Sequence, residues 1–187
     1  MQDLQKSSQP EVKRLAAEKM LFLINERVEG ISDVAFNIIE MMGSTSNLKT
    51  KQIAHLIAPY VLKQEEGEEG DRAGLLLLTV NNFKKDFQNL QGDCVVASFA
   101  INTLSSLCDP DLSSMIYREL FPLFTCTNPV IRKKVFALCV KIFLNSGENE
   151  EIIEELSPYL ADRLKDANAS VRMAAVSAIY EISRVNP

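Results

Sequence analysis

A short pattern recurs five times along this chain, at intervals of 35 to 46 residues. Each copy opens with a polar residue and carries a β-branched residue three positions later. The copies begin at Gln9, Asn47, Asp93, Asn128 and Asn168. A recurrence near 40 residues is typical of helical-repeat solenoids of the HEAT or armadillo kind. Because such arrays offer an extended surface to partners, the spacing predicts a binding scaffold.

The pattern also predicts the secondary structure, because an apolar column follows each copy at i, i+4, i+7 and i+11, which is one face of an α-helix. The five columns are Val12, Ala16, Lys19 and Leu23; Thr50, Ala54, Ile57 and Val61; Val96, Ala100, Thr103 and Leu107; Ile131, Val135, Leu138 and Ile142; and Val171, Ala175, Ala178 and Ile182. Lys19 is the one charged break. Asn128 and Asp93 suit an N-cap, and Pro129 suits a first helical position.

The fold expected is an all-α, HEAT/armadillo-like α-solenoid of about nine helices in antiparallel hairpins. The predicted helices cover about residues 10–28, 32–42, 47–63, 72–88, 93–107, 110–124, 128–145, 149–165 and 168–185. Residues 1–9 are expected to be a flexible N-terminus, and 10–187 a single solenoid domain. Residues 64–71, with five acids and two glycines, are predicted to be a flexible acidic loop. Because the sequence ends at Pro187 without a polar capping repeat, we expect a piece of a longer array.

The net charge, the apolar runs and the cysteine content each limit the classes of function that this chain can have. The net charge of −5 gives no whole-chain basic signature, so no nucleic-acid partner is predicted. No apolar run reaches the roughly 18 residues of a membrane span, and the polar N-terminus does not resemble a signal peptide. The four cysteines form no CxxC pair and there is one histidine, which disfavours zinc and disulfide frameworks. We therefore expect reduced thiols, a cytoplasmic protein and no cofactor or metal.

Enzymatic function is not predicted. The sequence contains no glycine-rich phosphate loop, no GxSxG and no HExxH. His55 follows the column residue Ala54 and is expected at a boundary or on the surface. Glu154 and Glu155 have no partner base nearby in the sequence and are interpreted as solvated charge.

Basic residues are the best candidates for a charged contact: Arg132, Lys133 and Lys134 at the start of the seventh predicted helix, Lys84 and Lys85 on the fourth, and Lys49 and Lys51 at the start of the third. Arg132 and Arg172 occupy equivalent repeat positions, so we interpret them as structural groups bonded to a neighbouring turn. Lys133 and Lys134 do not recur in the repeat. They are chosen as the contact to an acidic protein partner or an anionic lipid head group.

Four segments resemble a known family, the adaptin large subunits of adaptor-protein vesicle coats, and are most similar to delta-adaptin. Ala35–Met42 (AFNIIEMM) resembles AFNIIEVM, and Asn128–Val135 (NPVIRKKV) resembles NPYIRKKA. Thr79–Phe87 (TVNNFKKDF) resembles TTNxxxKDL, and the run from Ala100 to Leu112 resembles ALxALSxIxxPEL. Their order and spacing also agree, over roughly residues 10–187.

The resemblance implies an N-terminal trunk segment of an adaptor-complex large subunit, acting in intracellular protein transport. It implies a sigma-type small chain, other adaptor subunits and an Arf-family GTPase as partners, with peripheral contact to Golgi or endosomal membranes. The alternative is a free-standing HEAT-repeat scaffold that regulates an enzyme or carries transport cargo.

Overall fold

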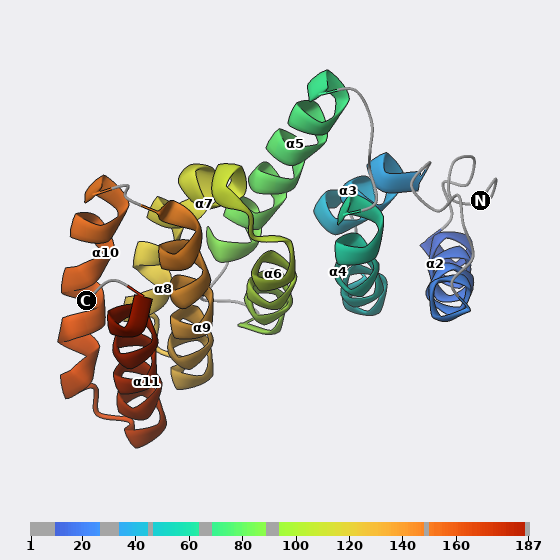
Figure 1. Cartoon of the computed structure of the whole chain (residues 1–187). Helices are drawn as coiled ribbons and strands as arrows, with labels where there is room; N and C mark the ends of the chain where they lie inside the picture. Colours follow the sequence, from blue (N-terminus) through green and yellow to red (C-terminus); the bar gives the residue numbers. More distant parts are fainter. Residues whose placement is uncertain are drawn as a thin grey trace. The chain divides into compact units, whose positions relative to one another are not determined.

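The computed structural model describes residues 10–26, 34–44, 47–63, 69–88, 94–147 and 150–185, and over these ranges every regular element is helical. The elements are α2 (Pro10–Asn25), α3 (Ala35–Ser44), α4 (Leu48–Lys63), α5 (Glu69–Gln88), α6 (Cys94–Leu107), α7 (Pro110–Ile116), the 3₁₀-helix η2 (Tyr117–Leu120), α8 (Phe121–Thr125), α9 (Pro129–Ser146), α10 (Glu150–Asp162), the 3₁₀-helix η3 (Arg163–Lys165) and α11 (Ala169–Val185) (Figure 1).

The predicted helices match these elements closely. Helices α7, η2 and α8 follow one another without a gap and together form the predicted helix 110–124. The helix α5 begins earlier than predicted, at Glu69, and takes three residues from the predicted acidic loop 64–71, and α3 continues to Ser44, beyond the predicted end at 42. Residues 64–68 of that loop, the predicted N-terminus 1–9 and the N-cap Asp93 lie outside the described ranges.

The chain divides into two compact units, Met1–Lys85 and Asp86–Pro187, and each is described by itself. In both units, helices that carry the recurring pattern pack against one another: α2 against α4 in the first, and α6 against α9 and α9 against α11 in the second. The helices between them in the chain, such as α3 and α10, pack against the same pattern helices. This is the packing of an α-solenoid, so the predicted fold class is confirmed. The single domain over 10–187 stays a prediction.

In the first unit, α4 packs against both α2 and α3. Its column of Thr50, Ala54, Ile57 and Val61 is buried as predicted. In α2 the predicted break of the column, Lys19, is exposed, whereas Ala16, Ala17 and Met20 are buried. Burying an unpaired ammonium is costly, so α2 presents the i, i+4 pair of Ala16 and Met20 to the core instead.

In the second unit, α9 packs against α6 and against α11. Its predicted column of Ile131, Val135, Leu138 and Ile142 is at most 1% exposed. In α11, Val171, Ala175 and Ala178 are buried and Ile182 is half-buried. In α6, Ala100 and Thr103 are buried, and Val96 and Leu107 are half-buried.

The polar residue that opens each described repeat caps its helix. Asn47 Oδ1 accepts from the backbone N–H of Thr50 at 3.1 Å, and Asn128 Oδ1 accepts from that of Val130 at 2.9 Å. Asn168 Oδ1 accepts from the N–H of Ser170 at 2.9 Å. An N-cap side chain satisfies one of the helix's unpaired amides, so the recurring polar residue fixes where each pattern helix begins.

Candidate interaction surfaces

The two recurring arginines form a clamp on the turn that precedes their own helix. Arg132 Nη1 donates to the carbonyl oxygens of Cys126 at 2.7 Å and Thr127 at 2.9 Å. Arg172 Nη1 makes the equivalent bonds, to the carbonyl oxygens of Asp166 at 2.7 Å and Ala167 at 3.1 Å. In both cases the two carbonyls belong to the residues six and five positions before the arginine. The structural interpretation of both arginines is therefore confirmed.

The Arg132 clamp extends into the next repeat through Asp166. Arg132 Nε lies 2.8 Å from Asp166 Oδ2, and Nη2 lies 2.9 Å from Oδ1. The Asp166 side chain is 2% exposed, and Arg163 adds a second cation at 3.5 Å. The hydrogen bond from Arg132 is the main cause that lowers the pKa of Asp166 to about 2. Sequence reasoning missed Asp166, although its place six residues before Arg172 was a usable signal.

Lys134, one of the two residues chosen as a charged contact, is engaged with a neighbouring helix. Its ammonium donates to the Ser98 hydroxyl and, at 3.2 Å, to the Asn102 side-chain oxygen, both on α6. The side chain is half-buried, and this burial lowers the pKa of Lys134.

Further along α9, two more side chains reach α6 in the same way. Lys141 donates to the backbone carbonyl of Ser105, and Asn145 donates to that of Cys108 at 3.1 Å. With Lys134, these contacts form a row of donors at i, i+7 and i+11 on α9, so the interface between α6 and α9 is partly polar.

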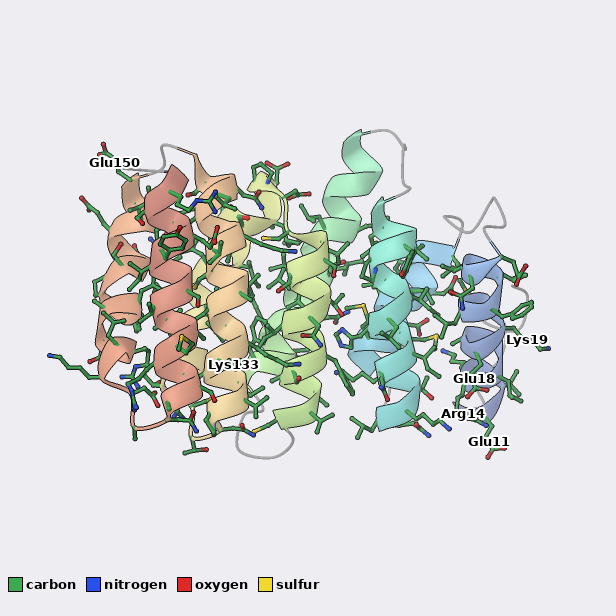
Figure 2. The ribbon with its side chains drawn as sticks, turned by 60° about the horizontal axis from the view of Figure 1, so that its bottom comes forward. Glu11, Arg14, Glu18, Lys19, Lys133 and Glu150 are labelled. Carbon is green, nitrogen blue, oxygen red and sulfur yellow. The ribbon has the colours of Figure 1, made fainter. Side chains whose placement is uncertain are left out.

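Lys133, the other chosen residue, lies on an exposed stripe of α9 (Figure 2). Its neighbours at helical spacing are Val130, which is 55% exposed, Ala137, Lys141 and Leu144, which is 49% exposed. The stripe combines apolar side chains with ammonium groups. It can therefore contact a partner that has both apolar and acidic groups.

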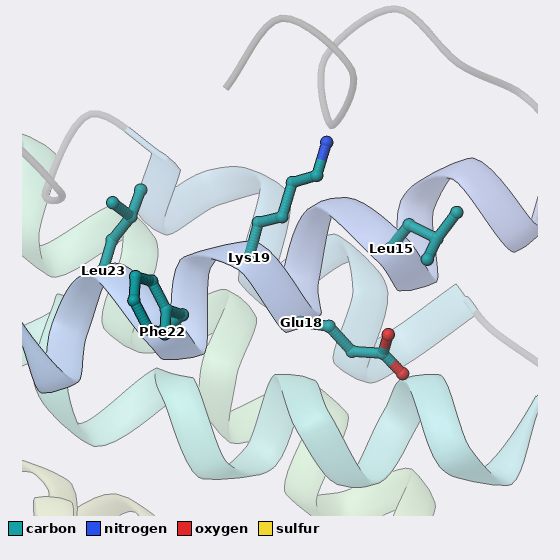
Figure 3. Close-up of a pocket in the computed structure, with 5 residues that line it drawn as sticks. All are labelled: Leu15, Glu18, Lys19, Phe22 and Leu23. Carbon is teal, nitrogen blue, oxygen red and sulfur yellow. The ribbon is translucent and has the colours of Figure 1, made fainter.

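An open groove on α2 is the second exposed surface, and it was not predicted (Figure 3). Leu15, Glu18, Lys19, Phe22 and Leu23 line a volume of about 480 Å³. Leu15 is 48% exposed and Phe22 63% exposed. Leu15 and Phe22 stand four residues before and three residues after Lys19, on the same side of the helix, so the polar break at Lys19 was the signal that this side is exposed.

A charged cluster ties η2 to α10 on the surface of the second unit. Arg118 donates to Glu151 at 2.5 Å and to both carboxylate oxygens of Glu155, at 3.1 and 2.8 Å. The bonds from Arg118 lower the pKa of Glu155. Glu155 was expected to be a solvated charge, but it belongs to an exposed ion pair between two helices.

His55 lies on α4 of the first unit, whereas the four cysteines belong to the second unit. The surface position expected for His55 was wrong: it is 3% exposed in α4, with its ring centroid 6.3 Å from that of Phe83. The four cysteines are free, and burial raises the pKa of the fully buried Cys139 thiol. Among the described residues, no three His, Cys, Asp or Glu side chains are grouped as metal ligands. No described helix is long and apolar enough to cross a bilayer.

Comparison with known proteins agrees with this architecture. A family described as "Adaptin N terminal region" matches residues 1–187. The chain belongs to the adaptin N-terminal family. The resemblance to delta-adaptin is confirmed by two relatives, the AP-3 complex subunit delta-1 of Bos taurus, 35% identical over 158 residues, and the AP-3 complex subunit delta of Saccharomyces cerevisiae, 33% identical over 153 residues.

These alignments cover 84% and 81% of this adaptin chain, but only 12% and 15% of the relatives. A structure described as a homology model of the full-length AP-3 complex in an intermediate open conformation matches 96% of this chain and 29% of its own, with a TM-score of 0.74 and 30% identity. The adaptin chain thus corresponds to a minor part of the length of a vesicle-coat adaptor large subunit.

Proposed function

We propose that this chain is a trunk segment of a vesicle-coat adaptor large subunit that holds partner proteins and performs no catalysis. The observation that carries the proposal is the match of the adaptin N-terminal family to the whole chain. Relatives of this chain are subunits of the AP-3 complex, so the partners proposed first are other adaptor subunits, including a sigma-type small chain.

The α2 groove supports binding to another subunit. Exposed apolar residues grouped on one helix face gain free energy when a partner covers them, at about 25 cal/mol per Å² of apolar area. Leu15 and Phe22 supply that area, and Glu18 and Lys19 give the rim groups of both signs. A groove of this composition fits an apolar helix or loop with a polar edge.

Lys133 and Lys134 are the proposed charged contact, either to an Arf-family GTPase or to acidic lipid at Golgi or endosomal membranes. Lys133 offers the more accessible ammonium, because that of Lys134 already donates to Ser98 and Asn102. Lys133→Glu is therefore the cleaner test. The loss of binding that this substitution causes should become smaller as the salt concentration rises, since exposed charges are screened over roughly 8 Å at physiological ionic strength.

The test is co-expression of the chain with a sigma-type small chain, followed by pull-down. The same chain is then tested with a GTP-loaded Arf-family GTPase and with acidic liposomes. Phe22→Ser should reduce capture of the small chain, whereas Phe36→Ser, at a residue 58% exposed on α3 and outside the groove, should not. Lys133→Glu should reduce GTPase or liposome binding, with Lys165→Glu, at an exposed lysine of η3, as the control.

If none of the three probes binds the parent chain, the adaptor function fails for this segment. Recovery of an enzyme or a transport cargo in their place would instead favour the free-standing HEAT-repeat scaffold. If binding occurs but the two variants behave as the parent does, only the choice of surfaces is wrong.

A further inference from the structure

Two half-buried thiols lie at the end of the interface between α6 and α9 where both helices begin. Cys94 is the first residue of α6, and Cys126 stands in the turn that precedes α9. Both thiols are free, and α6 packs against α9. The Cys126 thiol donates to the backbone carbonyl oxygen of Asn128, at 3.3 Å. Neither sulfur takes part in the interaction surfaces described above.

Side chains of α9 show how the two helices are aligned. Lys134 donates to Asn102, 32 residues earlier in the chain, and Lys141 donates to the carbonyl of Ser105, 36 residues earlier. Because these separations stay similar along α9, the two helices run parallel and begin side by side. The two cysteines are also 32 residues apart, the separation of Asn102 and Lys134.

The next repeat shows where a side chain in the position of Cys126 points. Asp166 stands two residues before the N-cap Asn168, and its carboxylate meets Arg132 in the first turn of α9, the preceding pattern helix. Cys126 likewise stands two residues before the N-cap Asn128. The same register therefore directs its thiol to the first turn of α6, which carries the other cysteine.

The two sulfurs also affect each other electrostatically. Burial is the main cause that raises the pKa of the Cys126 thiol, and a charge on Cys94 adds to it. The effect of one charge on another falls with distance, so the two groups lie near each other. Cys139, within α9 itself, is 0% exposed and is therefore out of reach of a reagent in solution.

We propose that Cys94 and Cys126 are an oxidation site for hydrogen peroxide, which joins them in a disulfide between α6 and the turn before α9. The Cys94 thiolate attacks one peroxide oxygen, so that an S–O bond forms, the O–O bond breaks, and the other oxygen leaves as water after taking up a proton. The Cys126 sulfur then displaces the hydroxyl of the sulfenic acid, which forms the S–S bond and releases a second water. In total the two thiols give up two protons and two electrons, and hydrogen peroxide becomes two waters.

The order of the two steps follows from the surroundings of Cys126. Its thiol donates to Asn128, and burial disfavours its thiolate, so it attacks second. Its carbonyl oxygen accepts from Arg132, so the disulfide fixes the turn that this arginine holds. The link also closes α7, η2 and α8 into a covalent loop within the second unit. The inference does not depend on the proposed coat function, so the two can fail separately.

The test exposes the folded parent to hydrogen peroxide, blocks the remaining thiols with N-ethylmaleimide and maps the non-reduced digest by mass spectrometry. We expect a peptide pair linked through Cys94 and Cys126, which separates on reduction with dithiothreitol. Cys126→Ser should instead accumulate Cys94 as the sulfenic acid, which dimedone traps. Cys108→Ser, at another half-buried cysteine of this unit, is the matched control and should form the link at the parent's rate.

A second arm repeats the oxidation of the parent in urea. The preference for Cys94 with Cys126 should then disappear in favour of pairs nearer in sequence, such as Cys126 with Cys139, because shorter loops close more easily in an unfolded chain. Three results would overturn the proposal. They are a main product of the folded protein that contains Cys108 or Cys139, further oxidation of Cys94 without any link, and the same yield of the proposed link in the folded and unfolded chain.

Discussion

Replacing Asp166 with asparagine tests the contact that joins α9 to the following repeat. The carboxylate accepts two hydrogen bonds from Arg132 and one from the backbone N–H of Asn168, at 2.9 Å, and is almost fully buried. Asparagine has nearly the same shape and can still accept from Asn168. The change therefore removes the negative charge opposite Arg132 and replaces one of the two oxygens that accept from it with an N–H₂ donor.

The magnitude follows from the pKa of Asp166, which is held at about 2 against an ordinary value of 3.8. One pKa unit corresponds to 1.36 kcal/mol, so the depression contributes about 2.4 kcal/mol to folding stability. Because the folded-state pKa is lowered, this stability is present above pH 4 and is lost as the pH falls towards 2. We expect Asp166→Asn to cost about 2 to 3 kcal/mol at pH 7, and about half as much at pH 3.

The measurement is urea denaturation of the parent and the variant, followed by circular dichroism at several pH values between 7 and 3. Amide exchange in α9 and α11 localises the loss to the second unit. Glu155→Gln is the matched control, since it also removes a carboxylate bonded twice to an arginine, but an exposed one. It should cost much less, because solvent screens exposed pairs. A difference between parent and Asp166→Asn that is the same at pH 7 and pH 3 would refute the reasoning.

Three further predictions concern burial and local packing. Val135→Asp should destabilise the second unit by several kcal/mol, because a carboxylate replaces a side chain that is 0% exposed; an unchanged thermal midpoint would contradict this. Gly43→Ala should lower the free energy of unfolding, since the new Cβ would lie 2.3 Å from Asn82 Oδ1. Gly74→Ala, where nothing lies within 4 Å of the new Cβ, should raise it by about 0.5–1 kcal/mol. If urea denaturation shows that both variants change the free energy of unfolding in the same direction, the close approach of Asn82 to Gly43 has no effect on stability. The Cys139 thiol should react with a thiol reagent only at the rate of unfolding, and fast labelling of the native protein would contradict its burial.

The sequence predicted the regular part of the fold because that part is set by local periodicity. The columns of α4 and α9 are buried residue for residue, and the cap predicted at Asn128 forms. The start of α5 was predicted too late because glycines and acids disfavour a helix, and local composition alone does not show what α5 packs against.

The polar contacts were harder to predict because their partners are far apart in sequence. Lys134 meets α6 about 36 residues upstream, and Arg132 meets Asp166 about 34 residues downstream. His55 is buried with its ring close to that of Phe83, a residue of another helix. In each case the residue type permits both a surface and a buried position, and only the packing of a distant segment decides between them.

Asp166 is also the point at which two repeats share one residue. Its side chain is held by Arg132 of α9, and its backbone carbonyl is held by Arg172 of α11. Fraying of α11 therefore loosens the turn that positions the carboxylate, and loss of the carboxylate leaves Arg132 half-satisfied. This linkage couples the unfolding of neighbouring repeats, whose interface energies otherwise simply add. The smallest cooperative block at this end of the chain is consequently α9 through α11, and not a single hairpin.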